Sequence, residues 1–180
     1  LEQLQRTTGE SVLLSTLLRG KVLWLEILRS RARAYQLLWG GQMSYPHSTS
    51  SGKAMLAFMS DGESEQICRT LGLPMQTENT IRTWTELHED LCRTRERGYA
   101  IDQGENVAGL CCIAAPIFGI DDKVLGAISI SFPANRFTPE TYLPIVPRLK
   151  YACQDVSRSL GATGKSIFKL VVAEQLEDRQ

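Results

Sequence analysis

The chain has 180 residues, with 20 basic and 20 acidic side chains, so its formal net charge is zero when histidine is neutral. Hydrophobic residues make up 43% of the chain and charged residues 22%. This composition is typical of one soluble globular domain and excludes collagen-like, low-complexity and strongly disordered classes. The sequence contains no run of about 18 apolar residues and no recognisable signal peptide, so we expect neither a transmembrane helix nor a membrane partner.

Net neutrality also argues against nucleic-acid binding by this chain itself, because such domains usually carry a basic face. Arg29, Arg31 and Arg33 would alternate onto one face of a strand, a pattern more typical of a solvated surface than of a phosphate track. The chain has five cysteines, at Cys68, Cys92, Cys111, Cys112 and Cys153. Their spacing fits neither a disulfide framework nor a CxxC zinc site, so we expect reduced thiols and a cytoplasmic protein.

The first part of the chain predicts a helix and three strands of an antiparallel sheet, over residues 1–8, 11–18, 21–28 and 35–39. Gly9 would end the helix, and Arg19-Gly20 would form the tight turn of a hairpin between the first two strands.

The middle of the chain predicts three helices. Small polar residues from His47 lead into a buried apolar helix that ends near residue 59. Ser60 with Glu63, and Thr83 with Glu86, have the spacing of capping boxes. We therefore expect two further helices, which end near Gly72 and Gly98.

The last part returns to strands, over residues 99–102, 110–118 and 124–132, and then to a helical region that begins near Thr138. Pro144 and Pro147 would kink or restart that region. In residues 124–132, alternation places Ser129 and Ser131 on one face and the isoleucines on the other. The order of strands, helices, strands and helix predicts an α+β fold with helices packed on an antiparallel sheet.

Two segments look like a phosphate-binding loop but lack its required residues. Ser51-Gly52-Lys53 has His47 where the leading glycine should stand, and Gly164-Lys165-Ser166 has Ser159 there. Neither segment can form the phosphate cradle, so we expect no nucleotide cofactor.

Three features are candidates for chemistry. The small residues from Ser48 to Gly52, at a helix start, could hold an anion such as a carboxylate on free N–H groups, although an ordinary N-cap is the simpler interpretation of this segment alone. Ser129 and Ser131 could direct two hydroxyls into a small cavity, or could face solvent on an edge strand.

The adjacent Cys111 and Cys112 form the third feature. They would face opposite sides of the sheet, and buried, inert thiols are the simpler interpretation. A thiol hydrolase could combine Cys112 with His47 and Asp102, and the same three residues could hold zinc. Neither a nucleophile turn nor a local ligand spacing supports these alternatives.

Several ordered segments carry a family likeness. HSTSSGKAMLAF and RERGYAIDQGENVAGLCCIAAPIFGIDDKVLGAISISFP resemble the two signatures of the IclR (isocitrate lyase regulator) family of bacterial transcription factors. The opening LEQLQRTTGESVLLSTLLRGKVLWLE and the later RFTPE and SRSLG are similar to the start and the end of that family's effector-binding domain.

The resemblance implies a GAF-like effector-binding domain over residues 1–161 and a tail over residues 162–180 that could form a helix. Family members carry an N-terminal winged helix-turn-helix domain, which is missing from this chain, so DNA would be contacted only through that domain. They form homodimers or homotetramers and respond to small carboxylates, without a cofactor. The resemblance therefore implies a sensing and oligomerisation domain and not an enzyme; an interaction domain without a ligand is the main alternative.

The resemblance also implies a pocket. Backbone N–H groups of Ser50 and Ser51 would hold the carboxylate, and further lining residues would be Asp102, Leu110, Cys112, Ser129 and Ser131. Asp102 would bind a hydroxyl, a water or a cation, because an ionised carboxylate cannot donate to another. Some relatives hold a metal here, so zinc at His47, Asp102 or Cys112 stays open. Phe132 stands where the family often has a glycine after the serine pair, and Asn106 departs from the family's usual pattern after the acidic residue. These departures leave the identity of the effector open.

Overall fold

The computed structural model describes residues 1–30 and 40–163. Its strands are β1 (Ser11–Leu18), β2 (Lys21–Leu28), β3 (Met43–Ser44), β4 (Ala100–Gln103), β5 (Leu110–Phe118) and β6 (Val124–Pro133). Its α-helices are α1 (Glu2–Thr8), α2 (Ser50–Leu56), α3 (Asp61–Leu71), α4 (Trp84–Arg97), α5 (Pro139–Tyr142) and α6 (Val146–Ser159). Short 3₁₀ turns are η2 (Pro46–Ser48), η3 (Ile120–Asp122), η4 (Ala134–Arg136) and η5 (Leu143–Ile145).

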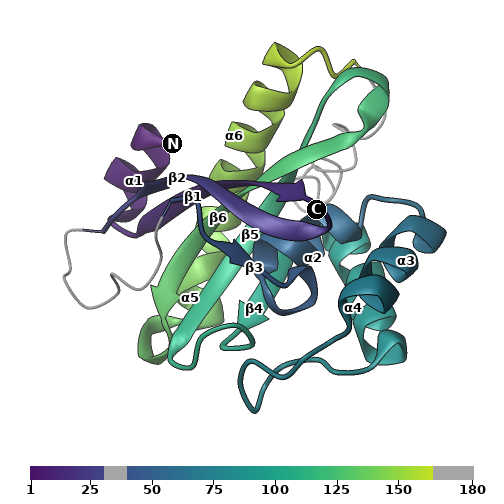
Figure 1. Cartoon of the computed structure of the whole chain (residues 1–180). Helices are drawn as coiled ribbons and strands as arrows, with labels where there is room; N and C mark the ends of the chain where they lie inside the picture. The colour runs from purple at the N-terminus through teal and green to yellow at the C-terminus, as the bar shows by residue number, and fades with distance from the viewer. Residues whose placement is uncertain (31–39, 164–180) are drawn as a thin grey trace, which may run out of the picture.

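The six strands form one sheet in the order β3-β2-β1-β6-β5-β4, with antiparallel pairing throughout (Figure 1). This arrangement confirms the predicted α+β fold. The strand expected at residues 35–39, Arg31, Arg33, the segment 164–166 and the rest of the tail lie outside the described residues. Among the described residues, Met43–Ser44 pairs with β2 on the side away from β1.

Helices α1 and α6 cover one face of the sheet (Figure 1). Ile128 and Ile130 of β6 project toward this face and pack with Leu149 and Cys153 of α6 and with Leu4 of α1. The alternation in β6 therefore places its isoleucines in this core, as predicted.

The opposite face is covered by α2, all seven residues of which are buried. Ala54 and Met55 pack against the small side chains of Ala114 and Ala127 on the sheet. Helices α3 and α4 form a further layer outside α2 (Figure 1). Because α2 lies between the sheet and this layer, its polar residues have little contact with solvent and need partners within the protein.

Local signals place the outer helices. Ser60 and Glu63 form the predicted capping box at the start of α3. At the start of α4, the Thr83 hydroxyl accepts from the Glu86 N–H, but the Glu86 carboxylate accepts from that hydroxyl and not from the Thr83 backbone. The predicted second capping box is therefore only half formed. Gly98 ends α4 in the left-handed conformation, as expected.

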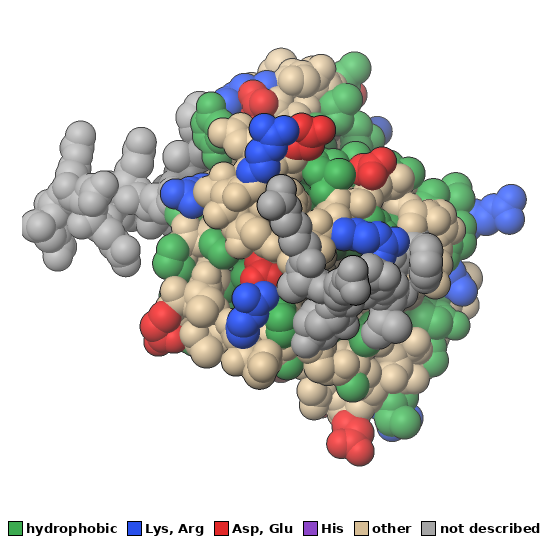
Figure 2. Space-filling model, turned by 90° about the vertical axis from the view of Figure 1, so that its left-hand side faces the viewer, with side chains coloured by type: hydrophobic (Ala, Val, Ile, Leu, Met, Phe, Trp, Pro, Cys, Tyr) green, Lys and Arg blue, Asp and Glu red, His purple; other side chains and the backbone are tan. Residues whose placement is uncertain are grey.

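The described surface is mixed in charge. On the face shown in Figure 2, basic and acidic side chains are interspersed among apolar and polar ones, and the basic ones form no continuous patch on its described part. Within residues 1–30 and 40–163, no helix has the length and apolar character needed to cross a membrane.

Gly52 marks the closest approach between two elements near α2. A Cβ added there would overlap the backbone of Pro46 in η2. Backbone atoms cannot move aside as a flexible side chain can, so only glycine allows η2 and α2 to pack this closely. At Gly62 in α3, by contrast, an added Cβ would meet no atom within 4 Å.

We expect Gly52→Ala to lower the free energy of unfolding by about 1 to 3 kcal/mol or more, because of overpacking against the backbone. Gly62→Ala is the matched control and should leave stability unchanged or raise it by up to about 1 kcal/mol. Urea denaturation measures both. Equal stabilities for the two variants would show that α2 and η2 can move apart at no cost.

All five cysteines are free, and only Cys92 is not buried. Burial raises the pKa of Cys68 to about 11 and that of Cys153 to about 12. Such thiols carry almost no reactive thiolate near neutral pH.

Iodoacetamide at pH 8 should therefore modify Cys92 alone in the folded protein and all five cysteines after unfolding in urea. Mass spectrometry of tryptic peptides gives the sites. The Cys92→Ser variant is the control and should remain unmodified while folded. Native modification of Cys111 or Cys112 at the rate of Cys92 would contradict the burial described.

Candidate functional site

The start of α2 points its small residues at the sheet. The Thr49 hydroxyl caps the helix by accepting from the Gly52 N–H at 3.1 Å. Helix geometry leaves the N–H groups of Ser50 and Ser51 without acceptors inside the helix. Both serines are 2% exposed, so these donors face the interior of the protein.

A small cavity of about 20 Å³ lies between this helix start and the sheet. Its lining consists of Leu13, Trp24, Thr49, Ser50, Ser51, Asp102, Asn106, Val107, Leu110, Cys112, Ser129 and Ser131. The structure thus brings all seven residues of the predicted pocket around one cavity. Thr49 belongs to the Ser48–Gly52 segment already considered as an anion site, and the remaining four, Leu13, Trp24, Asn106 and Val107, were not predicted from the sequence.

Two of the missed residues follow from strand pairing. Leu13 of β1 lies opposite Ser129, and the pairing of β1 with β2 brings Trp24 to the same face. The alternation of β1 and β2 was readable in the sequence, but the placement of β1 beside β6 was not. Asn106 and Val107 lie in the loop between β4 and β5, which carries no periodic signal.

The paired serines lie on an inner strand, because β6 has β1 on one side and β5 on the other. The solvent-facing edge-strand alternative is therefore wrong. Ser131 lies opposite Cys112 in the register, with 3.2 Å between Oγ and Sγ. Leu110 and Leu13 add apolar surface beside these hydroxyls.

Lys53 lies one turn into α2 and is 1% exposed. Its ammonium donates to both carboxylate oxygens of Glu105, at 2.7 and 2.8 Å, and lies 2.9 Å from Asp90 Oδ2 in α4. The residue that looked like a phosphate-loop lysine is thus an internal cation, consistent with the exclusion of a nucleotide site.

Asp102 stands between the cavity and this ion cluster. Its Oδ1 accepts from the Glu105 N–H at 2.6 Å, and the side chain is 3% exposed. Burial raises the pKa of Asp102 to about 7, and the negative charge of Glu105 adds to the rise, while backbone N–H groups and Lys53 oppose it. The carboxyl group is therefore partly neutral near physiological pH.

Cys112 and His47 do not form a catalytic or metal-binding group with Asp102. Burial raises the pKa of Cys112 well above its usual range, and the negative charge of Asp102 adds to this rise. His47 Nε2 lies 3.2 Å from the Pro74 carbonyl, and burial lowers the pKa of its ring. No group of three or more His, Cys, Asp or Glu side chains in the described ranges could hold a metal ion.

The loop between β4 and β5 closes one side of the cavity. It begins and ends at Gly104 and Gly109, both with positive φ. Hydroxyls of Thr77 and Thr80 donate to its carbonyls, and Asn106 Oδ1 accepts from Ser44 and Ser48. A cavity of this size holds about one water, so a metabolite needs this loop or α2 to move outward.

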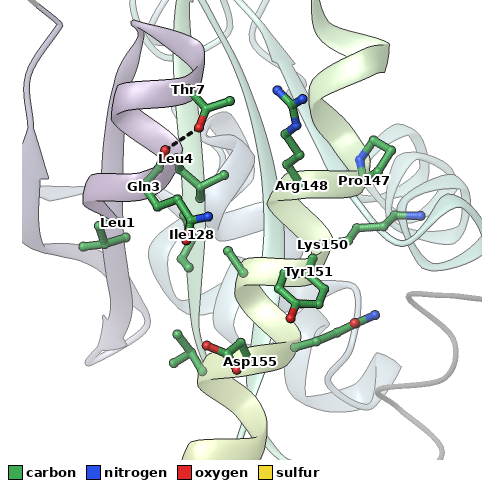
Figure 3. A pocket seen from close by; sticks show the side chains of 13 residues that line it. Leu1, Gln3, Leu4, Thr7, Ile128, Pro147, Arg148, Lys150, Tyr151 and Asp155 are labelled. Carbon is green, nitrogen blue, oxygen red and sulfur yellow. Dashed lines mark hydrogen bonds between the residues drawn. The ribbon is translucent and has the colours of Figure 1, made fainter.

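A second, larger hollow lies on the other face of the sheet. It is a groove of about 710 Å³ between α1 and α6 (Figure 3). Arg148, Tyr151 and Asp155 of α6 line it together with Leu1 and Thr7. Its polar groups are spread along two exposed helices and do not converge, so the smaller cavity is the better ligand site.

The sequence matches the family described as "Bacterial transcriptional regulator IclR C-terminal" over residues 1–158. It is 32% identical over 163 residues to the HTH-type transcriptional regulator KdgR of Escherichia coli K12. The alignment covers 89% of this chain and 61% of KdgR. The chain thus spans about three fifths of that regulator.

Solved structures agree. The crystal structure of the Thermotoga maritima IclR has a TM-score of 0.87 and 30% identity, covering 90% of this chain and 66% of that one. The C-terminal domain of E. coli KdgR has a TM-score of 0.81 and 31% identity, and the match covers 89% of this chain and 93% of that domain. The inducer-binding domain of a double mutant of PobR from Acinetobacter, in complex with 3-hydroxybenzoic acid, has a TM-score of 0.78 at 20% identity. The match covers 87% of this chain and 93% of that one, and it is a likeness of fold alone.

These relatives are transcriptional regulators and not enzymes. The family match extends over all the described strands and over the described helices as far as Arg158 in α6, and it includes the two segments that form the small cavity. The chain therefore belongs to the IclR family, in which it forms the C-terminal effector-binding domain of a bacterial transcriptional regulator.

Proposed function

We propose that residues 1–161 bind a small carboxylate metabolite in the cavity beside α2 and thereby modulate DNA binding by a regulator that acts in the cytoplasm. The observation that carries this proposal is the convergence of hydrogen-bond donors on one buried cavity. Backbone N–H groups of Ser50 and Ser51 enter it from α2, and the hydroxyls of Ser129 and Ser131 enter it from the sheet.

The chemistry of the lining suits a carboxylate with a small apolar body. N–H and hydroxyl donors bind carboxylate oxygens, and donors without other partners in a buried site favour an anionic acceptor. Leu13, Trp24 and Leu110 provide apolar walls for the rest of the molecule. The acid described in complex with PobR supports this class of ligand.

The size of the cavity suggests how binding becomes a signal. A carboxylate larger than one water can enter only if α2 or the Gly104–Gly109 loop moves outward. The ligand then favours the open arrangement by its difference in affinity for the two states. In the full regulator, this change would alter the spacing of two DNA-reading domains, which lie beyond this chain.

The first experiment is thermal unfolding with acetate, propionate, lactate, succinate, benzoate and 3-hydroxybenzoate, each with and without a chelator. A carboxylate at 100 times its dissociation constant should stabilise the domain by about 2.7 kcal/mol, or about 5 to 10 °C. A loss of stability with chelator alone would favour a resident metal. No shift with any compound would favour the interaction domain without a ligand.

The double variant Ser129→Ala, Ser131→Ala should lose the ligand-induced shift, because two donors leave the cavity. Its melting temperature without ligand should stay within a few degrees of the unaltered protein. Ser159→Ala, exposed at the end of α6, is the control and should respond fully. Unchanged affinity in the double variant would remove both serines from the site.

We also propose that the domain forms homodimers, or homotetramers built from them, through the groove between α1 and α6. Arg148 and Asp155 lie two turns apart on the exposed face of α6, with Tyr151, 65% exposed, between them (Figure 3). Neither charge has an ion-pair partner within residues 1–30 and 40–163. An antiparallel second copy of α6 would place each Arg148 against Asp155 of the partner subunit, an isologous contact.

Charge exchange tests this surface. Arg148→Asp and Asp155→Arg should each weaken self-association by about tenfold or more, because like charges then meet twice. The double exchange should restore it. Sedimentation velocity over a range of concentrations gives the dissociation constants. Single variants that associate as tightly as the unaltered chain would place the contact elsewhere.

A further inference from the structure

Three buried carboxylates surround one buried ammonium group beside the cavity. Glu105 takes two short hydrogen bonds from Lys53 Nζ, and Asp90 lies 2.9 Å from the same atom. Asp102 makes no ion pair in the described ranges; it accepts only backbone N–H groups, from Glu105 and Asn106. Within the described ranges, Lys53 is therefore the one buried cation that lies among these three acidic side chains.

Within residues 1–30 and 40–163, Lys53 is the one cation that acts on Asp102, and it does so without forming an ion pair with it. From β5, Cys111 and Cys112 present thiols whose pKa values are raised, first of all by burial, so they are neutral near pH 7. From η2, His47 has a lowered pKa, because of burial, and is neutral as well. The α2 ammonium of Lys53 is directed at Glu105 and Asp90, and Arg93 in α4 lies 3.5 Å from Asp90.

Of the three carboxyl groups, Asp102 is the one that lines the cavity without a cation of its own. Its burial without an ion-pair partner disfavours the ionised form and so raises the share of the neutral acid, against the effect of the two backbone N–H groups. The pKa of about 7 agrees with this argument from geometry. A neutral carboxyl group differs from an ionised one in having an O–H donor.

We propose that Asp102 is a specificity-determining residue that, as the neutral acid, donates a hydrogen bond to the carboxylate of the effector, so that binding is coupled to the uptake of one proton. This inference rests on the proposed function, since it names a role at the same site. In molecules where Asp102 is already neutral, its proton stays in place when the ligand binds. In molecules where Asp102 is ionised, the carboxylate takes up one proton from solvent as the ligand binds.

The arrangement resolves a conflict in the pocket. Asp102 would repel a bound carboxylate if it were ionised, yet it lies in the same lining as the donors of Ser50, Ser51, Ser129 and Ser131. As a neutral acid it becomes a further donor, and a bond from O–H to a carboxylate oxygen is short and strong. The sign follows: affinity is highest below pH 7 and falls as Asp102 ionises above it.

The test is isothermal titration calorimetry with acetate, propionate, lactate and benzoate, which are ionised throughout the range from pH 6 to pH 8. Affinity should be about tenfold weaker at pH 8 than at pH 6, because only about one protein molecule in ten is then competent. In phosphate and Tris buffers at pH 8, which differ in heat of ionisation, the apparent binding enthalpies should differ by the equivalent of nearly one proton taken up.

Asp102→Asn supplies a permanent N–H donor of the same shape. It should bind with an affinity that changes less than about twofold between pH 6 and pH 8, and it should take up no proton. Asp121→Asn, an exposed position in η3, is the matched control and should keep the full pH dependence. The buffer comparison on the unaltered protein stands alone if Asp102→Asn does not fold.

The outcomes separate the two proposals. A carboxylate that binds the unaltered protein equally at pH 6 and pH 8, without proton uptake, overturns the role of Asp102 and leaves the proposed function standing. Proton uptake that persists in Asp102→Asn also overturns it, because another group then titrates. Failure of every carboxylate to bind at either pH overturns the proposed function, and this inference with it.

Discussion

The buried ion pair between Lys53 and Glu105 holds the pocket together. It joins α2 to the loop between β4 and β5, the two segments that enclose the cavity from above the sheet. Asp90 extends the contact to α4. Breaking one partner of such a pair leaves an uncompensated buried charge, which is strongly unfavourable. The segments that contact a ligand are therefore linked electrostatically and not only by apolar packing.

Serines, an aspartate and a thiol share the buried lining of the cavity. Three polar groups of the wall have partners in the structure: Ser131 with Cys112, Asp102 with the Glu105 N–H, and Asn106 with Ser44 and Ser48. These internal bonds help the wall to stay closed in the absence of a large occupant. Opening it exchanges these internal bonds for bonds to the ligand.

Much of the fold was predictable because its signals are local. The Ser60–Glu63 capping box and the alternation in residues 124–132 depend only on neighbours in the chain, and both recur in the structure. Strand order is not local, so Leu13 and Trp24 were missed as lining residues. Lys53 attracted notice only as part of a false phosphate loop, because sequence does not reveal that a lysine is buried among carboxylates. The seven residues that lie together around the cavity were named largely through family likeness and not through spacing.

The alternation of β6 has a consequence for the two hollows of the molecule. Ser129 lines the small cavity on one face, and its immediate neighbour Ile128 lines the groove between α1 and α6 on the other. The two hollows thus share a partition that is a single strand thick. A displacement of β6 toward one face would enlarge the hollow on the other face and narrow the hollow on its own side. The small cavity and the helices α1 and α6 are therefore mechanically coupled through this strand, although they lie on opposite faces of the sheet.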